Sequence, residues 1–501
     1  MSKGYNILFI TTDQEHFFSE YPEGTEYKAR KLLSEMGTTF EKHYVCSNMS
    51  TSSRSVIYTG THITDTKMID NTDFPWQGAL DESVTTIGDR MREAGYYTAY
   101  KGKWHMGKES ILEENAEKLT SLEGYGFADW GGKDYIGSMH EGYEADPIIA
   151  QEAIDWLEDK GKKLNDDGVP FFLAVNMVNP HDIMEYDNTG FESMMLELGG
   201  APDDPVYQKK YDVKAPASWN MDLNADDVPQ AIRNYHDRWT MQTGDITREE
   251  AWRDYQDYYL NCIQDSDNSL MKIISAVKEN DMLDNTIIVF TADHGELHGS
   301  HALKGKGGML YDNNIHVPLI IVHPDYEGNK AVSAITSHMD LAPTFIDIAG
   351  KSSEQLAGSS LINLMDGKET TIREGALFCF EMLSLATMDV GMGPEGKPEF
   401  SFKPEQRGMV RGITTDRYKY ARYFGPMGFN MPETLDEIME HNDVQLFDLK
   451  NDSDELINLA SDPIANKELI LEMNGKLNDL IRKEIGNDEG QEVKECLKIF
   501  G

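Results

Sequence analysis

The chain has 501 residues, of which 40% are hydrophobic, and a formal net charge of -41. This length predicts one large domain with a smaller one, and the hydrophobic fraction excludes a disordered chain. So negative a protein is not expected to bind nucleic acid or an anionic membrane surface. An anionic substrate would therefore require basic residues concentrated at one place.

The cysteines and the start of the chain bear on its compartment. The four cysteines are widely spaced, with no CxxC pair, which predicts free thiols and neither a zinc knuckle nor a disulfide framework. The chain enters an apolar segment at residues 5–10 without a signal peptide, and no apolar run reaches membrane-spanning length. We therefore expect a cytoplasmic protein as the chain stands, with a trimmed leader as the alternative.

Apolar runs and helical patterns alternate along the first three quarters of the chain. Residues 5–10, 171–175, 286–290 and 318–322 predict buried parallel strands. Residues 84–94, 148–157 and 251–277 predict helices between them. This alternation predicts an α/β fold with a doubly wound, mainly parallel sheet, in which ligands bind beyond the carboxyl ends of the strands.

The remaining segments predict the domain organisation. Residues 183–250 are acidic and irregular, which indicates an insertion near the site within a catalytic domain of residues 1–390. Residues 391–404 are rich in Gly and Pro and predict a loop. A hairpin over 408–423, a strand over 445–449 and an amphipathic helix over 468–485 predict a small C-terminal α+β subdomain of residues 391–501.

Carboxylates and a histidine follow two of the predicted strands. Asp13 comes after the strand at 5–10, and Asp293 and His294 come after the strand at 286–290. Each could be a turn or capping residue alone. Together they form an oxygen-rich set with one nitrogen, which suits Ca²⁺ or Mn²⁺. We expect one divalent ion at this edge of the sheet.

Basic residues follow other strands. Lys103 and His105 come after a strand-like segment at 96–100, His181 comes after the strand at 171–175, and Lys306 lies in a Gly-rich loop. An ammonium can hold an anion and an imidazole can move a proton. Each residue alone could be a structural or surface group. Their placement in so acidic a chain predicts an anion site.

A hydroxyl and an arginine share the segment at 50–60. Ser50 lies four residues before Arg54, and the helix predicted there would stop at Gly60. The first turn of a helix offers free N–H groups and a positive dipole end, which suit an anionic ester. Ser50 is therefore a candidate nucleophile, with an N-cap as the alternative.

These motifs together resemble the sulfatase family of the alkaline phosphatase superfamily. The matching segments span nearly the whole chain in order: 6–14, 50–60, 102–107, 179–181, 293–295, 301–306 with Tyr311, 317–318, 337–344, 416–420, 446–449 and 455–458. The resemblance implies an alkaline-phosphatase-like fold and a metal-dependent hydrolase of organic sulfate monoesters, acting on a small molecule or a saccharide. A homo-oligomer is compatible with it.

The resemblance also implies residue roles. Asp13, Asp293 and His294 would bind the metal, with Ser50 completing its shell and Ca²⁺ favoured over Mn²⁺. The groups around the nucleophile and the transferred sulfate would be Arg54, Lys103, His105, His181 and Lys306. The family normally has an acid where Gln14 stands and often Asn where His294 stands, which weakens the choice between the two metals.

The nucleophile departs from the family signature. That signature is Cys or Ser, any residue, Pro or Ala, any residue, Arg, and its first residue is oxidised to formylglycine. Here Ser50 is followed by Ser52 at the Pro or Ala position, and Cys46 lies four residues too early. A matured serine, an unmodified serine and an engineered replacement of cysteine all remain open.

Two other functions stay open at this point. One is a phosphodiesterase or phosphonate monoester hydrolase with the same metal cluster. The other is a non-catalytic binding protein, which the retained basic residues and metal ligands disfavour.

Overall fold

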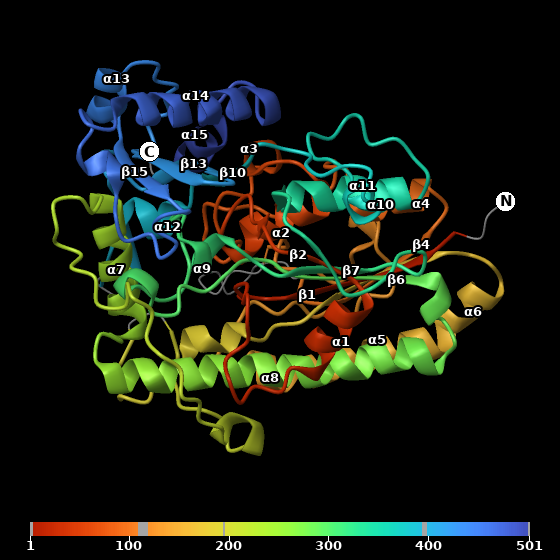
Figure 1. Cartoon of the computed structure of the whole chain (residues 1–501). Helices are drawn as coiled ribbons and strands as arrows, with labels where there is room; N and C mark the ends of the chain where they lie inside the picture. The colour runs from red at the N-terminus through yellow and green to blue at the C-terminus, as the bar shows by residue number, and fades with distance from the viewer. Residues whose placement is uncertain (1–3, 109–118, 194–195, 393–397, 499–501) are drawn as a thin grey trace.

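A seven-stranded sheet lies at the centre of the chain (Figure 1), in the strand order β4-β5-β1-β6-β7-β2-β8. The structure is a computed structural model that describes residues 4–108, 119–193, 196–392 and 398–498. The strands are β4 (Tyr97–Gly102), β5 (Phe171–Asn176), β1 (Asn6–Thr12), β6 (Thr286–Ala292), β7 (Leu319–Val322), β2 (Thr38–Phe40) and β8 (Lys330–Val332). Strands β4, β5, β1 and β6 run parallel, so the predicted doubly wound sheet is confirmed.

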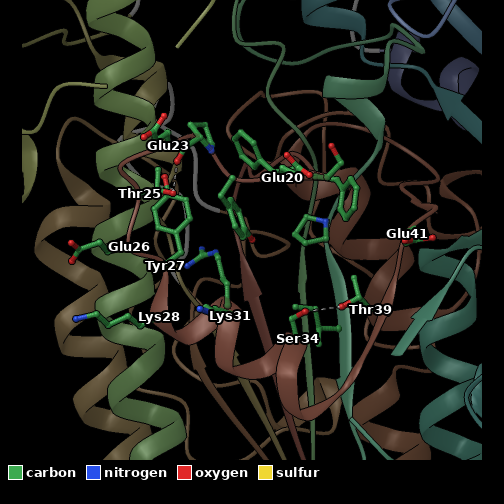
Figure 2. Close-up of a pocket in the computed structure, with 18 of the residues that line it drawn as sticks. Glu20, Glu23, Thr25, Glu26, Tyr27, Lys28, Lys31, Ser34, Thr39 and Glu41 are labelled. Carbon is green, nitrogen blue, oxygen red and sulfur yellow. Dashed lines mark hydrogen bonds between the residues drawn. The ribbon is translucent and has the colours of Figure 1, made fainter. Parts of the chain in front are cut away.

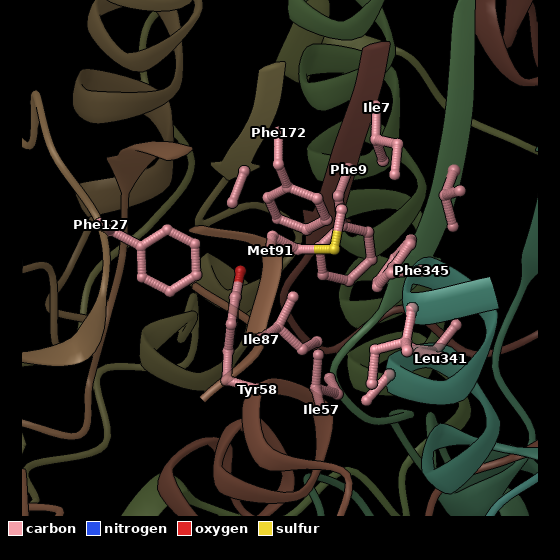
Figure 3. Close-up of a cluster of buried hydrophobic side chains, with 14 of the residues drawn as sticks. Ile7, Phe9, Ile57, Tyr58, Ile87, Met91, Phe127, Phe172, Leu341 and Phe345 are labelled. Carbon is pink, nitrogen blue, oxygen red and sulfur yellow. The ribbon is translucent and has the colours of Figure 1, made fainter. Parts of the chain in front are cut away.

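Helices cover both faces of this sheet (Figure 1). Alternate residues of a strand point to opposite faces, so Phe9 and Leu8 enter different cores. On one face lie α1 (Lys28–Met36), α5 (Glu141–Trp156) and α8 (Glu249–Glu279), and on the other lie α2 (Ser50–Thr59), α4 (Ile87–Glu93) and α10 (Leu341–Ile348). The ring of Phe345 in α10 lies 5.1 Å from both Phe9 and Phe172 (Figure 3).

The direction of β7 differs from the prediction. Residues 318–322 were expected to form a parallel strand, but β7 runs antiparallel to β6, with Thr291 opposite Leu319. The physical reason is the connection. Between Ala292 and Leu319 the chain forms only two short helices, η6 (Ser300–Ala302) and α9 (Asp312–Ile315), and neither carries it across the sheet. The chain therefore turns back beside β6, and β7 runs antiparallel to it. A buried apolar run alone does not specify strand direction.

A second, antiparallel sheet forms the C-terminal part. It contains β10 (Gly375–Phe380), β13 (Met409–Thr415), β14 (Tyr418–Phe424) and β15 (Asp443–Asp448), and α14 (Lys467–Glu484) packs against it. The predicted hairpin, strand and amphipathic helix are confirmed. Because β10 precedes residue 391, this sheet begins earlier in the chain than the expected subdomain. The boundary itself stays a prediction.

The segment 391–404 was expected to be a loop, and this is wrong at both ends. β11 (Met388–Met392) pairs with β12 (Pro398–Phe402), while residues 393–397 lie outside the described residues. Pro398 is the first residue of its strand, a position where the missing N–H does little harm. Met388 is buried against Phe402, so apolar packing outweighs the Gly and Pro signal.

The remaining α-helices and strands are β3 (His43–Tyr44), α3 (Ile63–Thr66), α6 (Lys162–Asp166), α7 (Gln230–Thr243), β9 (Thr336–Ser337), α11 (Ile362–Met365), α12 (Leu383–Ala386), α13 (Leu435–His441) and α15 (Gln491–Leu497). Among them, α7 has 14 residues and lies in the segment 183–250, so the expectation that this segment is irregular is wrong there. All four cysteines are free, as expected. Within the described ranges, none of the helices has the length and apolar character needed to cross a membrane.

Candidate active site

Ser50 is the first residue of α2, so its side chain lies where the helix N–H groups are free. The helix ends at Gly60, which has φ of 71° and would place a Cβ only 2.8 Å from the side chain of Ala342. The Ser50 Oγ lies 3.1 Å from His294 Nε2 and 3.3 Å from Asp13 Oδ2. The helix start therefore faces the carboxylates at the strand ends.

Two strand ends bring the acidic residues together. Strands β1 and β6 pair in parallel with Thr12 opposite Ala292, so Asp13 and Asp293 leave the same edge side by side. One ligand atom each from Asp13, Asp293 and His294 lies within 4.8 Å of the others, and all three residues are buried. Burial and the charge of Asp13 raise the pKa of Asp293. A divalent ion would relieve this repulsion, so the donor set fits the expected metal.

Three cations surround Asp13. The nitrogen atoms Lys103 Nζ, Arg54 Nη2 and Lys306 Nζ lie 2.8, 3.1 and 4.0 Å from its carboxylate. Burial acts to raise the pKa of Asp13, but the positive charges of Lys103, Lys306 and Arg54 outweigh burial and hold this pKa well below the usual value. Arg54 Nε also donates to Asp293 at 3.0 Å. The predicted basic residues thus counter the acidic set directly.

Lys306 reaches the site from the Gly-rich loop, whereas the other lysine of that loop, Lys304, donates to the carbonyl of Thr243. Lys306 Nζ donates to Gln14 Oε1 at 2.7 Å. Burial lowers the pKa of Lys306 to about 8, although Asp13 acts in the opposite direction.

The two histidines predicted for the site, His181 and His105, lie at the edge of this group of carboxylates and cations. His181 and Lys306 line one cavity, and burial followed by the Lys306 charge lowers the pKa of His181 well below its usual value. Gly137 lies against that ring with φ of 89°, and a Cβ there would fall 2.1 Å from His181 Cε1. His105 accepts a hydrogen bond from Thr51 Oγ1 through its carbonyl. Its Nε2 lies 3.5 Å from Asp73 Oδ2.

The cavity beside Ser50 has a volume of about 130 Å³. Its walls are mainly apolar and include Met49, Phe74, Met184, Trp239, Met382 and Leu385. These residues come from the chain between residues 49 and 74, from the segment 183–250 and from the chain that follows β10. Several distant segments therefore close over one small space.

A larger hollow lies elsewhere. It has a volume of about 880 Å³ and is lined by residues 17–28 and the start of β7, among others (Figure 2). The residues labelled in Figure 2 include the acidic Glu20, Glu23 and Glu26 and the basic Lys28 and Lys31. Its lining contains none of the candidate site residues. We therefore place the chemistry in the smaller cavity.

Sequence reasoning missed two supporting residues. Asn176 ends β5, and its Oδ1 accepts from Arg54 Nη1 at 3.2 Å and from Tyr58 Oη at 2.9 Å. Glu296 accepts from Gln14 Nε2 at 2.5 Å. Asn176 could have been noticed because it follows a buried strand, and Glu296 because it closes the Asp293 motif.

Comparisons with known proteins agree with this geometry. A family model described as Sulfatase matches residues 5–351. Arylsulfatase K of Gallus gallus is 27% identical over 485 residues, which cover 91% of this chain and 79% of that protein.

Two solved structures show the same fold. A 2-O GAG sulfatase aligns with a TM-score of 0.72 at 21% identity, covering 98% of this chain and 96% of the other. The phosphonate monoester hydrolase of Agrobacterium radiobacter aligns with a TM-score of 0.68 at 19% identity, covering 96% of each chain. At such identities the likeness concerns the fold alone. The family model spans more than half of the residues, and the chain therefore belongs to the sulfatase family of the alkaline phosphatase superfamily.

Proposed function

We propose that the chain hydrolyses organic sulfate monoesters with the side chain at position 50 as the nucleophile. The observation that carries this proposal is the position of Ser50 Oγ, 3.1 Å from His294 Nε2 at the start of α2. Around it, buried carboxylates are countered by Arg54, Lys103 and Lys306. An anionic ester needs this concentration of positive charge in a protein of net charge -41.

A divalent ion would be held by Asp13, Asp293 and His294, together with the side chain at position 50. Ca²⁺ is our first choice because oxygen donors dominate, and Mn²⁺ is the alternative because His294 supplies a nitrogen. When bound, the ion supplies positive charge that lowers the pKa of the attacking hydroxyl and stabilises the transition state.

Side chains of the protein would stabilise the charge of the ester and protonate the departing alcohol. Lys103 and Arg54 hold Asp13 ionised and oppose the charge of the ester oxygens. His181 and Lys306 line the same cavity and are the candidate donors of a proton to the departing alcohol oxygen. His105 lies beside Thr51 and supports the turn next to the nucleophile.

The chemistry of position 50 decides how turnover is completed. In formylglycine hydrate, two hydroxyls share one carbon: one attacks sulfur and displaces the alcohol. When the second hydroxyl then loses its proton, the C–O bond to the sulfate breaks, so that sulfate leaves and an aldehyde remains, to which water adds again. An unmodified serine has no second hydroxyl, so water would have to cleave the sulfated serine. We propose formylglycine in the active form.

The second candidate is a phosphonate monoester hydrolase or phosphodiesterase. Two features favour keeping it: the fold shared with the Agrobacterium radiobacter enzyme, and the departures from the usual sulfatase pattern at Gln14 and His294. Sulfate release from 4-nitrophenyl sulfate, compared with nitrophenol release from 4-nitrophenyl phenylphosphonate, separates the two. We expect the sulfate ester to be preferred, and a preference for the phosphonate would select the second candidate.

Mass spectrometry of the peptide 43–54 tests the modification without a substrate. Formylglycine lacks two hydrogen atoms relative to serine and reacts with hydrazines. An unmodified peptide in an enzyme that releases sulfate would exclude the formylglycine step. If activity appears only in Ser50→Cys made with a maturing enzyme, Ser50 replaces an original cysteine.

A further inference from the structure

We infer that Glu185 acts through His181 to protonate the departing alcohol. As the S–O bond of the ester breaks, the proton on His181 Nε2 passes to the alcohol oxygen, and the proton of the Glu185 carboxyl passes to His181 Nδ1. This inference rests on the proposed ester hydrolysis and deepens its protonation step. It depends on two buried atoms, one on each residue, that have no hydrogen-bond partner within the described ranges.

The two residues lie on one anchored turn. They are the first and last residues of the 3₁₀ helix η3 (His181–Glu185), and both line the cavity of about 130 Å³. Asp182 fixes this turn to the start of α5, because its carboxylate accepts from the backbone N–H of Gly142 at 2.7 Å and from that of Tyr143 at 2.9 Å. The backbone therefore sets the spacing of the two side chains.

The unpartnered atoms of this pair complement each other. They are His181 Nδ1 and Glu185 Oε2, which lie 3.8 Å apart, about 1 Å more than a hydrogen bond. An unpaired buried polar atom costs free energy, and one hydrogen placed between these two atoms would satisfy both. Hydrogen bonds between catalytic groups are often long before a substrate binds. We therefore expect the carboxyl to turn toward the ring when the ester enters.

The surroundings favour a hydrogen on Glu185. Burial, together with Asp182, raises the pKa of Glu185 well above the usual value, although Lys306 and Lys103 act in the opposite direction. Burial, followed by the charges of Lys306 and Lys103, lowers the pKa of His181 well below its usual value. Both partners are therefore neutral. The carboxyl O–H donates to Nδ1 once the gap closes, and the ring hydrogen is on Nε2.

His181 could not easily donate a proton without this partner. A neutral imidazole that gives up its Nε2 proton becomes an imidazolate anion. An imidazolium cation would be buried and would experience the charges of Lys306 and Lys103, which oppose it. If Nδ1 gains a proton from Glu185 while Nε2 loses its own, the ring stays neutral throughout.

The charges balance at the end of the step. The electron pair of the S–O bond stays on the alcohol oxygen, which takes the Nε2 proton, and Nε2 keeps the electron pair of its N–H bond. Glu185 becomes a carboxylate, and the charges of Lys306 and Lys103 favour that form. It regains a proton from solvent after the alcohol has left, so the pair is ready for the next ester.

Two leaving groups of different basicity isolate this step. Phenolate needs a proton to leave, because phenol has a pKa of about 10, as tyrosine does, whereas the stabilised 4-nitrophenolate needs little help. We would measure kcat/KM for phenyl sulfate and 4-nitrophenyl sulfate. We expect Glu185→Gln to lower the value for phenyl sulfate at least about tenfold more than that for 4-nitrophenyl sulfate. The exposed control Glu250→Gln should change neither. An equal loss on both esters, or no loss, would overturn the inference.

A second variant separates proton transfer from simple positioning of the ring. The amide of Glu185→Gln can still donate a hydrogen bond to His181 Nδ1 but cannot give up a proton, whereas Glu185→Met can do neither. We expect both variants to show the same selective loss on phenyl sulfate. If Glu185→Gln keeps the wild-type activity and only Glu185→Met loses it, Glu185 merely holds the ring and the inference is wrong.

His181→Asn removes the ring through which Glu185 is inferred to act. In that background we expect Glu185→Gln to cause less than about a twofold further loss on phenyl sulfate. A further loss as large as in the wild type would show that Glu185 acts independently of His181. The proposed function is read from hydrolysis of 4-nitrophenyl sulfate by the wild type. If the phosphonate is preferred, phenyl and 4-nitrophenyl phenylphosphonate give the same comparison, so the two ideas can fail separately.

Discussion

Gln14 connects Lys306 to Glu296 through the two ends of its side-chain amide. Its Oε1 accepts from Lys306 Nζ at 2.7 Å, and its Nε2 donates to Glu296 Oε2 at 2.5 Å. The backbone of Gln14 has φ of 70°, and its N–H donates to Asp293 at 3.1 Å. Both ends of the Gln14 amide therefore bind other side chains of the protein, at the position where the family normally has an acid.

Replacing Gln14 tests whether it positions Lys306. Gln14→Met keeps the length of the side chain but removes two hydrogen bonds, the one that Lys306 Nζ donates and the one that Glu296 Oε2 accepts. We expect kcat to fall at least about tenfold with KM little changed, because a preorganised charge is lost. Metal content should stay the same, and its loss would show that Gln14 is a ligand instead.

The metal assignment predicts the effect of Asp293→Asn. The amide keeps the shape of the side chain but removes one of two carboxylates from the set with Asp13. We expect the variant to fold, to lose bound metal and to lose at least about 100-fold in kcat/KM. Metal content by atomic emission and folding by circular dichroism are the measurements. The exposed control Asp226→Asn should retain both metal and activity, and full metal in Asp293→Asn contradicts the site.

Ser52 stands at the Pro or Ala position of the signature, and its buried Oγ has no hydrogen-bond partner among the described residues. Ser52→Ala should therefore raise the free energy of unfolding by about 1 kcal/mol, because it removes an unsatisfied hydroxyl from a helix. The matched control is Ser53→Ala, which loses a hydrogen bond to the carbonyl of Asp293 and should be destabilised. Urea unfolding of both variants gives the comparison. A destabilised Ser52→Ala would mean that the hydroxyl has a partner.

His301 should make the fold sensitive to acid. Its ring stacks on Tyr311 at 3.5 Å, and burial lowers its pKa from 6.5 to about 4. Between these values the unfolded chain binds a proton that the folded chain does not, so the free energy of unfolding falls as the pH falls. At pH 5 this loss amounts to about 2 kcal/mol.

The test compares urea unfolding at pH 7.5 and pH 5 in the wild type and in His301→Asn. Asparagine does not titrate and tolerates the φ of 57° at this position. We expect the wild type to lose about 2 kcal/mol more than the variant over this interval. Parallel losses in the two proteins would show that other groups cause the acid sensitivity.

Gly137 is predicted to hold His181 in place by leaving room for its ring. In Gly137→Ala the new methyl group would overlap the imidazole, so we expect kcat to fall at least about tenfold through displacement of His181. Gly95→Ala is the matched control, because Gly95 has a similar φ of 92° but nothing within 4 Å of the position that its Cβ would take. If both variants lose the same activity, backbone strain and not the ring contact is the cause.

Local sequence predicted the central strands and the residues at their ends. Asp13, His181 and Asp293 each follow a buried apolar run, and parallel strands deliver such residues to one edge. The antiparallel direction of β7 was not predicted, because a buried apolar run looks the same in a parallel and in an antiparallel strand. The pairing of β11 with β12 was not predicted, because several Gly and Pro residues in so short a segment are typical of a loop.

The walls of the cavity were not predictable for a different reason. Met184, Trp239 and Met382 are ordinary apolar residues in sequence and could as well fill a core. Only the packing of three distant segments brings them together around one cavity. Likewise, Gln14 looked like an altered metal ligand, and only its two contacts assign it to Lys306 and Glu296.

The chain around β10 supplies Met382, Ser384 and Leu385 to the cavity, beyond residue 351 where the match to the family model ends. All the candidate catalytic and metal-binding residues lie at or before Lys306. One part of the cavity wall is therefore encoded outside the stretch of the gene that encodes the candidate catalytic and metal-binding residues. A change confined to the later stretch would alter that part of the wall and leave those residues unchanged.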